Sequence, residues 1–169
     1  MGYRNKTYVA FASEDIHLYR LMEAWRDNDH IEFDFFDAHD LFQARDTSLR
    51  ETIKRNLRER MKNAKQVVLI GSPDAKRKGG DGHSFLSYEV ELIKELNLPV
   101  VIANKGGSRL IKKEFIPSPF LDAGYYTISV SLQPTIIKFA LDDYTDVFKK
   151  EKREGPHAYS ADTYSRLGM

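Results

Sequence analysis

One glutamate stands on a helical stripe that is otherwise apolar. The stripe belongs to a helix predicted at residues 84–96 and consists of Phe85, Glu89, Leu92, Ile93 and Leu96. A carboxylate there has two interpretations. It pairs with a lysine or caps a backbone amide at the rim of the stripe, or it acts beside an aromatic ring, stabilising developing positive charge and accepting hydrogen bonds from sugar hydroxyls. The periodicity leaves both open, whereas Glu91 and Glu95 fall off the stripe and are expected at the surface.

The second interpretation points to cleavage of a ribosyl bond, because that reaction passes through an oxocarbenium-like state. Other chemistries have less support. The absence of cysteine excludes thiolate metal sites and a cysteine nucleophile, and no serine lies in a nucleophile-elbow pattern. No two of the histidines have the i, i+4 spacing of a zinc helix: His17, His30, His39, His83 and His157. We therefore expect no metal site, and we interpret His83 as a cap or loop residue.

Short β-rich runs alternate with longer helical patterns along most of the chain. Strands are predicted at residues 7–12, 31–36, 67–70, 99–103 and 125–130. Helices are predicted after Asp15 and at 48–61, 84–96 and 134–150, whereas 73–82 has the composition of a basic, glycine-containing loop without phosphate-loop spacing. The alternation predicts an α/β fold: a flavodoxin-like parallel five-stranded sheet, order 2-1-3-4-5, with helices on both faces. Strand 31–36 is expected at an edge because its alternate face is acidic.

In that strand order the chain reverses direction beside the first strand, which leaves a crevice between strands one and three. The residues expected at the crevice are Phe11, Ala12 and Ser13 after the first strand, and Gly71 and Ser72 after the third. This argument locates a ligand site and names no reaction. A phosphate-accepting receiver domain is disfavoured, because it needs an aspartate where Gly71 and Ser72 stand.

Length and charge balance narrow the class of protein further. The chain has 169 residues, which fits one domain, placed at 1–150, followed by a polar extension at 151–169. Lys and Arg number 26 against 25 Asp and Glu, so no strong field attracts nucleic acid or an anionic membrane. No apolar run approaches the roughly 18 residues that span a bilayer, and residues 1–6 do not resemble a signal peptide. We expect a cytoplasmic protein that binds neither nucleic acid nor a membrane.

Three segments resemble the TIR family, and more narrowly the bacterial TIR-like proteins of Thoeris-type antiphage defence. Residues 8–15, which end in Ala-Ser-Glu-Asp, are similar to the first TIR box. Residues 36–46 look like the BB loop, and residues 85–89 look like the motif of Trp, Cys, two variable residues and the catalytic Glu. The resemblance covers about residues 5–148. Three positions depart from it: Phe85 replaces the Trp, Leu86 the Cys, and Ala10 a common Ser of the first box.

The resemblance implies an enzyme that cleaves the bond between nicotinamide and ribose in NAD, giving ADP-ribose, a cyclic variant or a related signal nucleotide. NAD would be the substrate, with no further cofactor. Nicotinamide leaves from a cationic ring, so one glutamate suffices where ordinary glycosidases need two carboxylates. By resemblance Glu89 is the catalytic residue, and the substrate-binding candidates are Phe11, Ala12, Ser13, Asp37, Ser72 and Phe85. The resemblance also implies a homo-oligomer on activation and an effector protein reached through the nucleotide signal.

Two other functions remain open. The chain could be a non-catalytic interaction module that signals by self-association, in which case residues 39–46, with Arg45, form a contact surface. It could also be a nucleoside deoxyribosyltransferase-like enzyme, since that class places a glutamate in a flavodoxin-like cleft. A panel of substrates separates these classes.

Overall fold

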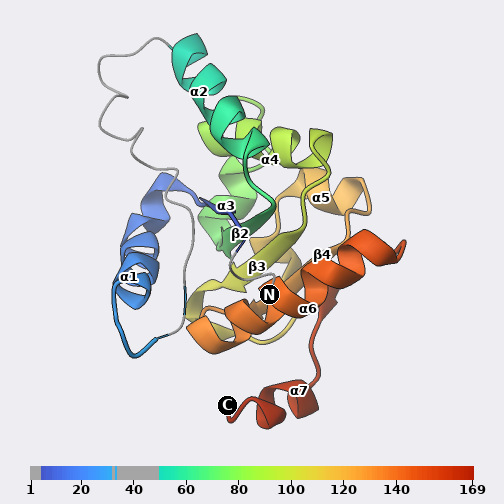
Figure 1. Cartoon of the computed structure of the whole chain (residues 1–169). Coiled ribbons are helices and arrows are strands. Elements are labelled where there is room, and N and C mark those ends of the chain that lie inside the picture. Colours follow the sequence, from blue (N-terminus) through green and yellow to red (C-terminus); the bar gives the residue numbers. More distant parts are fainter. Residues whose placement is uncertain (1–4, 32, 34–49) are drawn as a thin grey trace.

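Five parallel strands form the centre of the molecule. The computed structural model describes residues 5–31, 33 and 50–169 (Figure 1). The strands lie in the order β1-β2-β3-β4-β5, with bounds Thr7–Ala10, Gln66–Gly71, Val100–Asn104, Thr127–Ser131 and Pro156–Ala158. One row of residues in register crosses the whole sheet: Val9, Val68, Val101, Ile128 and His157. The carboxyl ends of all the strands therefore meet at one edge, where a ligand site is expected.

The flavodoxin-like α/β class is confirmed, and the described sheet differs from the predicted order 2-1-3-4-5 in the segment that supplies its fifth strand. Four predicted strands correspond to β1, β2, β3 and β4. The predicted strand at 31–36 lies mostly outside the described residues, and its two described members, Ile31 and Phe33, are not in a strand. The fifth described strand instead comes from the tail. β5 is short and begins with Pro156, and an edge position tolerates both features because only one side of the strand must pair.

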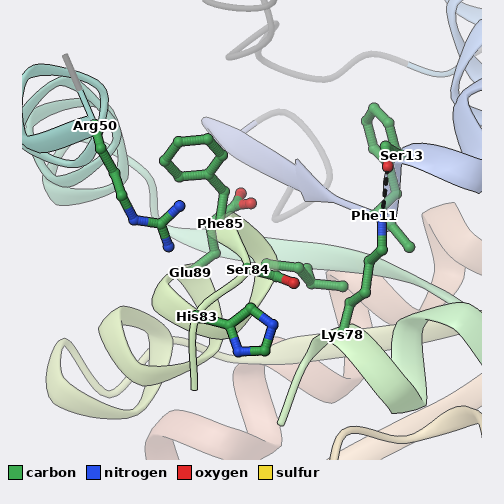
Figure 2. A pocket seen from close by; sticks show the side chains of 10 residues that line it. Phe11, Ser13, Arg50, Lys78, His83, Ser84, Phe85 and Glu89 are labelled. Atoms are coloured by element: carbon green, nitrogen blue, oxygen red, sulfur yellow. Dashed lines mark hydrogen bonds between the residues drawn. The ribbon is translucent and has the colours of Figure 1, made fainter. Parts of the chain in front are cut away.

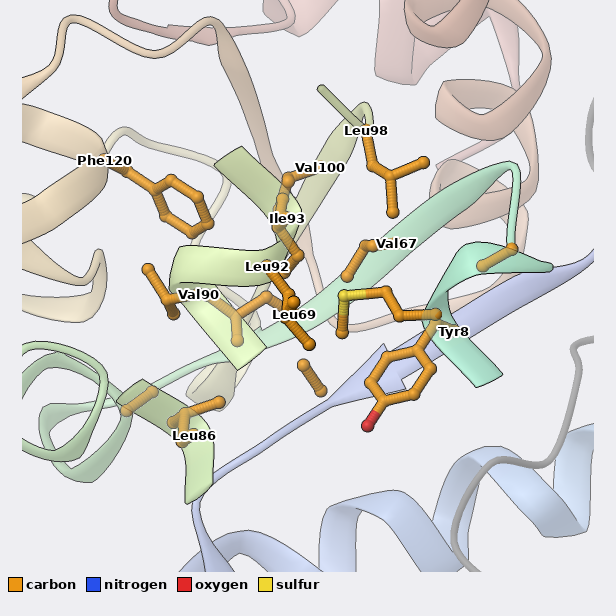
Figure 3. Close-up of a cluster of buried hydrophobic side chains, with 14 of the residues drawn as sticks. Tyr8, Val67, Leu69, Leu86, Val90, Leu92, Ile93, Leu98, Val100 and Phe120 are labelled. Carbon is orange, nitrogen blue, oxygen red and sulfur yellow. The ribbon is translucent and has the colours of Figure 1, made fainter. Parts of the chain in front are cut away.

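Helices cover both faces of the sheet, as predicted. One face carries α1 (Ile16–Arg26), α6 (Pro134–Lys150) and α7 (Ala161–Arg166). The other carries α2 (Arg50–Lys62), α3 (Pro73–Lys78), α4 (Phe85–Glu95) and α5 (Ser118–Asp122). Successive strand residues point to opposite faces, so Val9 and Phe11 join the first core while Tyr8 and Ala10 join the second. Figure 3 shows the second core, in which Tyr8 lies near the apolar side chains of β2 and α4.

α3 replaces part of the loop predicted at 73–82. Ser72 is its N-cap, and the Ser72 Oγ accepts a hydrogen bond from the backbone N of Ala75 at 3.0 Å. Pro73 stands in the first turn, where its fixed φ and missing N–H are tolerated. A capping serine followed directly by proline is a helix-start signal, and it explains why this basic segment is helical.

The C-terminal extension packs onto the domain. Tyr164 of α7 is completely buried in the core that α1 and α6 cover, and its hydroxyl accepts a hydrogen bond from the backbone N of Ser131 at 3.1 Å. β5 pairs with β4, and Tyr164 belongs to the core that α1 and α6 cover, so residues of the extension contribute to the sheet edge and to one core. In the described part of the chain no helix has the length and apolarity required to cross a membrane.

Candidate functional site

A pocket of about 270 Å³ opens beside the carboxyl end of β1, between α2, α3 and α4 (Figure 2). It is lined by residues that follow β1, by one residue each from α2 and α3, and by the start of α4: Phe11, Ala12, Ser13, Arg50, Lys78, His83, Ser84, Phe85, Leu86 and Glu89. The volume is at the small end for ligand pockets, which suits one ring and sugar of a larger ligand.

Glu89 lies at the inner wall of this pocket. Its side chain is only 2% exposed, and the Tyr8 hydroxyl on β1 donates a hydrogen bond to its Oε2. The predicted stripe on α4 explains this position, since the face that buries Leu92 and Ile93 against the sheet also turns Glu89 inward. Glu91 and Glu95 are exposed, which confirms that they are surface acids. The site thus holds a carboxylate in a nearly dry place, where its interactions with charge are strong.

Two phenylalanines are among the residues that line the pocket. The Phe11 ring is stacked on Tyr19 of α1 with a centroid separation of 4.8 Å, which fixes its orientation. Phe85 is half-buried, and the guanidinium carbon of Arg50 lies over its ring at 4.8 Å from the centroid. The aromatic ring that the family resemblance requires one turn before Glu89 is therefore present as phenylalanine.

The outer wall carries a compact ionic cluster. Lys78 Nζ donates to Glu14 Oε1 at 2.5 Å and to Ser13 Oγ at 2.8 Å, and Arg77 contacts Glu14 Oε2 at 2.6 Å. The hydrogen bond from Lys78 lowers the pKa of Glu14 to about 2, with a further contribution from the Ser13 hydroxyl and despite an opposing effect of burial. This cluster ties α3 to the residues after β1 and holds Lys78 at the pocket.

The loop before α4 is fixed by one aspartate. Asp81 Oδ1 accepts hydrogen bonds from the backbone N of His83 at 2.9 Å and of Ser84 at 2.8 Å, and its Oδ2 accepts one from the Ser84 hydroxyl. Burial raises the pKa of Asp81, but these bonds outweigh it and hold the pKa at about 2. The predicted loop residue His83 does lie in this loop, at the pocket rim, with a side chain that is 80% exposed.

The structure brings most of the predicted site residues together. Phe11, Ala12, Ser13, Phe85 and Glu89 line one pocket, although they come from segments more than 70 residues apart. Asp37 lies outside the described residues.

Ser72 is the exception, because the structure places it outside the pocket lining. Besides capping α3, its hydroxyl donates a hydrogen bond to Asp15 Oδ2, and Lys105 Nζ lies 3.5 Å from the other Asp15 oxygen. Asp15 is completely buried, so Ser72 and Lys105 supply the donors that a buried carboxylate needs. Ser72 does lie at the strand end, as the crevice geometry predicted, but its hydroxyl is engaged by the N-terminus of α3 and by Asp15.

Several site residues were not predicted. Arg50 and Lys78 belong to segments rich in basic residues, where nothing in the pattern singles one of them out. Leu86 and Ser84 flank the predicted Phe85. Tyr8 could have been found, since strand alternation places it on the face opposite Val9, where α4 packs.

The site holds no obvious metal centre. Among the described residues, no three histidine, cysteine, aspartate or glutamate side chains are grouped in a way that could hold an ion.

Comparison with known proteins identifies the family. No curated protein matches the chain. The family described as Thoeris protein ThsB, TIR-like domain, matches residues 8–107, which run from β1 through Glu89 to the turn after β3. This match covers more than half of the chain and includes every described residue of the pocket. The chain therefore belongs to the TIR-like domain family of the Thoeris protein ThsB.

Proposed function

We propose that this protein acts in Thoeris-type antiphage defence by cleaving the bond between nicotinamide and ribose in NAD. The observation that carries the proposal is the placement of Glu89, a carboxylate 2% exposed at the inner wall of a pocket that Phe85 also lines. The family match supplies the biological setting. NAD is the substrate here, and the chemistry requires no additional cofactor.

The reaction needs little from the protein beyond positioning and charge. The C1′–N bond breaks, its electron pair moves onto the cationic nicotinamide ring, and positive charge develops on the ribose. Glu89 stabilises that charge and accepts hydrogen bonds from the ribose hydroxyls. Nicotinamide departs neutral, so no acid must protonate it. Water attacks C1′ to give ADP-ribose, or a nucleophile of the substrate itself attacks to give a cyclic product, and the released proton passes to solvent.

The pocket walls fit a flat leaving group. Phe85 lies one turn before Glu89 on α4 and offers an aromatic surface in the same pocket, and Phe11 and Ala12 line the pocket where β1 ends. Ser13 offers a hydroxyl at the rim, although Lys78 and Glu14 already contact it. We expect activation to involve assembly of several copies and the product to act on an effector protein.

The experiment is chromatography of NAD incubated with concentrated protein, with and without lysate from infected cells. Wild type is compared with Glu89→Gln and with Glu91→Gln, an exposed acid two residues away on the same helix that contacts Lys94 at 3.6 Å. We expect nicotinamide release by wild type and Glu91→Gln and none by Glu89→Gln, at nearly equal Tm. Loss of both activity and Tm in Glu89→Gln would make Glu89 a structural residue.

One observation favours a second function. Glu89 already has a buried hydrogen-bond partner in Tyr8, which is also what a structural carboxylate needs. In that case the protein is an interaction module that signals by self-association. No release of nicotinamide from NAD in any condition, together with concentration-dependent assembly, would support this function. Cleavage of nucleosides but not NAD would indicate a deoxyribosyltransferase-like enzyme instead.

A further inference from the structure

The pocket carries opposite charges at two depths. Among the described residues that line it, Glu89 is the one carboxylate, and it lies on the inner wall. Arg50 and Lys78 lie on the outer part and come from different helices, α2 and α3 (Figure 2). A ligand that matches this arrangement has a cationic ring or sugar at one end and an anionic group a short distance from it.

Arg50 and Lys78 differ in how their charges are already used. Lys78 is held between Glu14 and Ser13, and that carboxylate offsets much of its charge. Arg50 instead lies over the Phe85 ring, with 4.8 Å between the guanidinium carbon and the ring centroid. That distance is within the range of a cation–π interaction, which leaves the net positive charge in place.

The contact with Phe85 also holds the guanidinium of Arg50 at the pocket. A guanidinium carries its N–H groups in its own plane, as a fork of donors. Those donors match two oxygens of a phosphate in a bidentate arrangement, which an ammonium group cannot reproduce. Phe85 thus serves as a wall of the pocket and as a platform for an anion-binding side chain.

We propose that Arg50 is a specificity-determining residue that binds the diphosphate of a dinucleotide substrate while Glu89 holds the ribose at the scissile bond. This inference rests on the proposed function and adds a residue that selects the dinucleotide. The site then takes dinucleotides in preference to a nucleoside that contains the same nicotinamide–ribose bond.

The test compares NAD with nicotinamide riboside, which has the same scissile bond and no phosphate. The variants are Arg50→Gln and Arg50→Lys, and the control is Arg55→Gln, which removes the same charge from an exposed position of the same helix. We expect Arg50→Gln to raise the KM for NAD about ten- to a hundredfold with little change in kcat, because one charge-assisted contact is lost. Arg50→Gln should leave cleavage of the riboside unchanged. Arg50→Lys should restore little of the KM for NAD, and Arg55→Gln should resemble wild type with both substrates.

Two kinetic results would overturn the assignment. Equal losses with NAD and the riboside would make Arg50 a support for Phe85 with no role in phosphate binding. Equal losses in Arg50→Gln and Arg55→Gln would reduce its effect to general electrostatic attraction.

Binding of ADP-ribose separates this inference from the proposed function. ADP-ribose retains the diphosphate and has no bond to cleave, so its binding to Glu89→Gln protein is measurable by calorimetry without turnover. We expect binding that weakens at least tenfold when Arg50→Gln is added to Glu89→Gln. If NAD is not cleaved but ADP-ribose binding weakens in this way, the diphosphate subsite is supported and the proposed reaction is wrong. If NAD is cleaved but ADP-ribose does not bind, or binds equally well with and without Arg50→Gln, the assignment of the diphosphate subsite to Arg50 is wrong.

Discussion

The Tyr8 hydroxyl on β1 donates a hydrogen bond to Glu89 on α4, so the orientation of the candidate catalytic carboxylate is set by the strand beneath it. Both side chains are almost completely buried. A buried pair of this kind fixes one rotamer of the glutamate, which matters when the carboxylate must face the ribose.

Tyr8→Phe should lower nicotinamide release about tenfold and the free energy of unfolding by about 1–2 kcal/mol, because one hydrogen bond to a buried carboxylate is lost. The control is Tyr125→Phe, which removes a bond of 2.6 Å from the Tyr125 hydroxyl to the Leu98 carbonyl, remote from the pocket. We expect a similar loss of stability there and unchanged activity. Chromatography measures nicotinamide release, and urea denaturation measures the free energy of unfolding. Equal activity in the two variants would mean that Tyr8 has no role in the site.

Ser72→Ala should destabilise the protein by about 2–3 kcal/mol. It removes the cap of α3 and also a donor to the buried carboxylate of Asp15, and both losses are costly. Ser160→Ala is the matched control, since Ser160 caps α7 through a bond of 3.3 Å to the Thr163 backbone N at an exposed site. We expect less than about 1 kcal/mol from that change. Similar urea midpoints for the two variants would mean that Asp15 finds its donors elsewhere.

Acid should weaken the loop before α4. The pKa of Asp81 is lowered from its ordinary 3.8 to about 2, so its contribution to stability is fully present above about pH 4 and is lost as the pH falls through 2. Asp81→Asn keeps an acceptor for the two backbone amides but does not titrate. Between pH 4 and 2, wild type should therefore lose about 1–2 kcal/mol more than Asp81→Asn, allowing for partial solvent screening. Parallel curves of unfolding free energy against pH would contradict this.

Tyr164 should report how strongly the tail is attached. Tyr164→Ala leaves a large cavity in the core and should destabilise the protein by about 3–5 kcal/mol, as other buried aromatic truncations do. Tyr164→Phe keeps the ring and loses the bond to Ser131, so about 1 kcal/mol is expected. Urea denaturation followed by circular dichroism distinguishes them. A negligible effect of Tyr164→Ala would make the tail a loose appendage after all.

The core strands could be predicted because buried parallel strands are nearly continuous apolar runs, as in residues 67–70 and 99–103. Glu89 could be predicted for the opposite reason, since a charged residue interrupts an otherwise apolar stripe. β5 could not be predicted, because three residues beginning with Pro156 show no alternation. Its pairing depends on β4, which lies far from it in the sequence.

Arg50 illustrates a different limit. Its helix carries basic residues on several sides, and only the packing of α2 against α4 determines which of them reaches the pocket. Arg58, on the same helix, instead forms a bidentate pair with Glu95 at 3.1 Å, a contact that raises the pKa of Arg58 and lowers that of Glu95. Side chains of one type thus take different roles according to which neighbour lies opposite, and a single sequence does not contain that information.

The register between β1 and β2 has a consequence for the order in which the protein folds. Thr7 pairs with Gln66, 59 positions along the chain, whereas β2, β3 and β4 follow one another through shorter connections. Closing the longest loop costs the most chain entropy, so we expect β1 to join a sheet that β2, β3 and β4 have already begun. Tyr8, Phe11 and Ser13 arrive with β1. A folding intermediate that lacks this strand therefore has α4 but no complete pocket, and activity should appear only in the last kinetic phase of refolding.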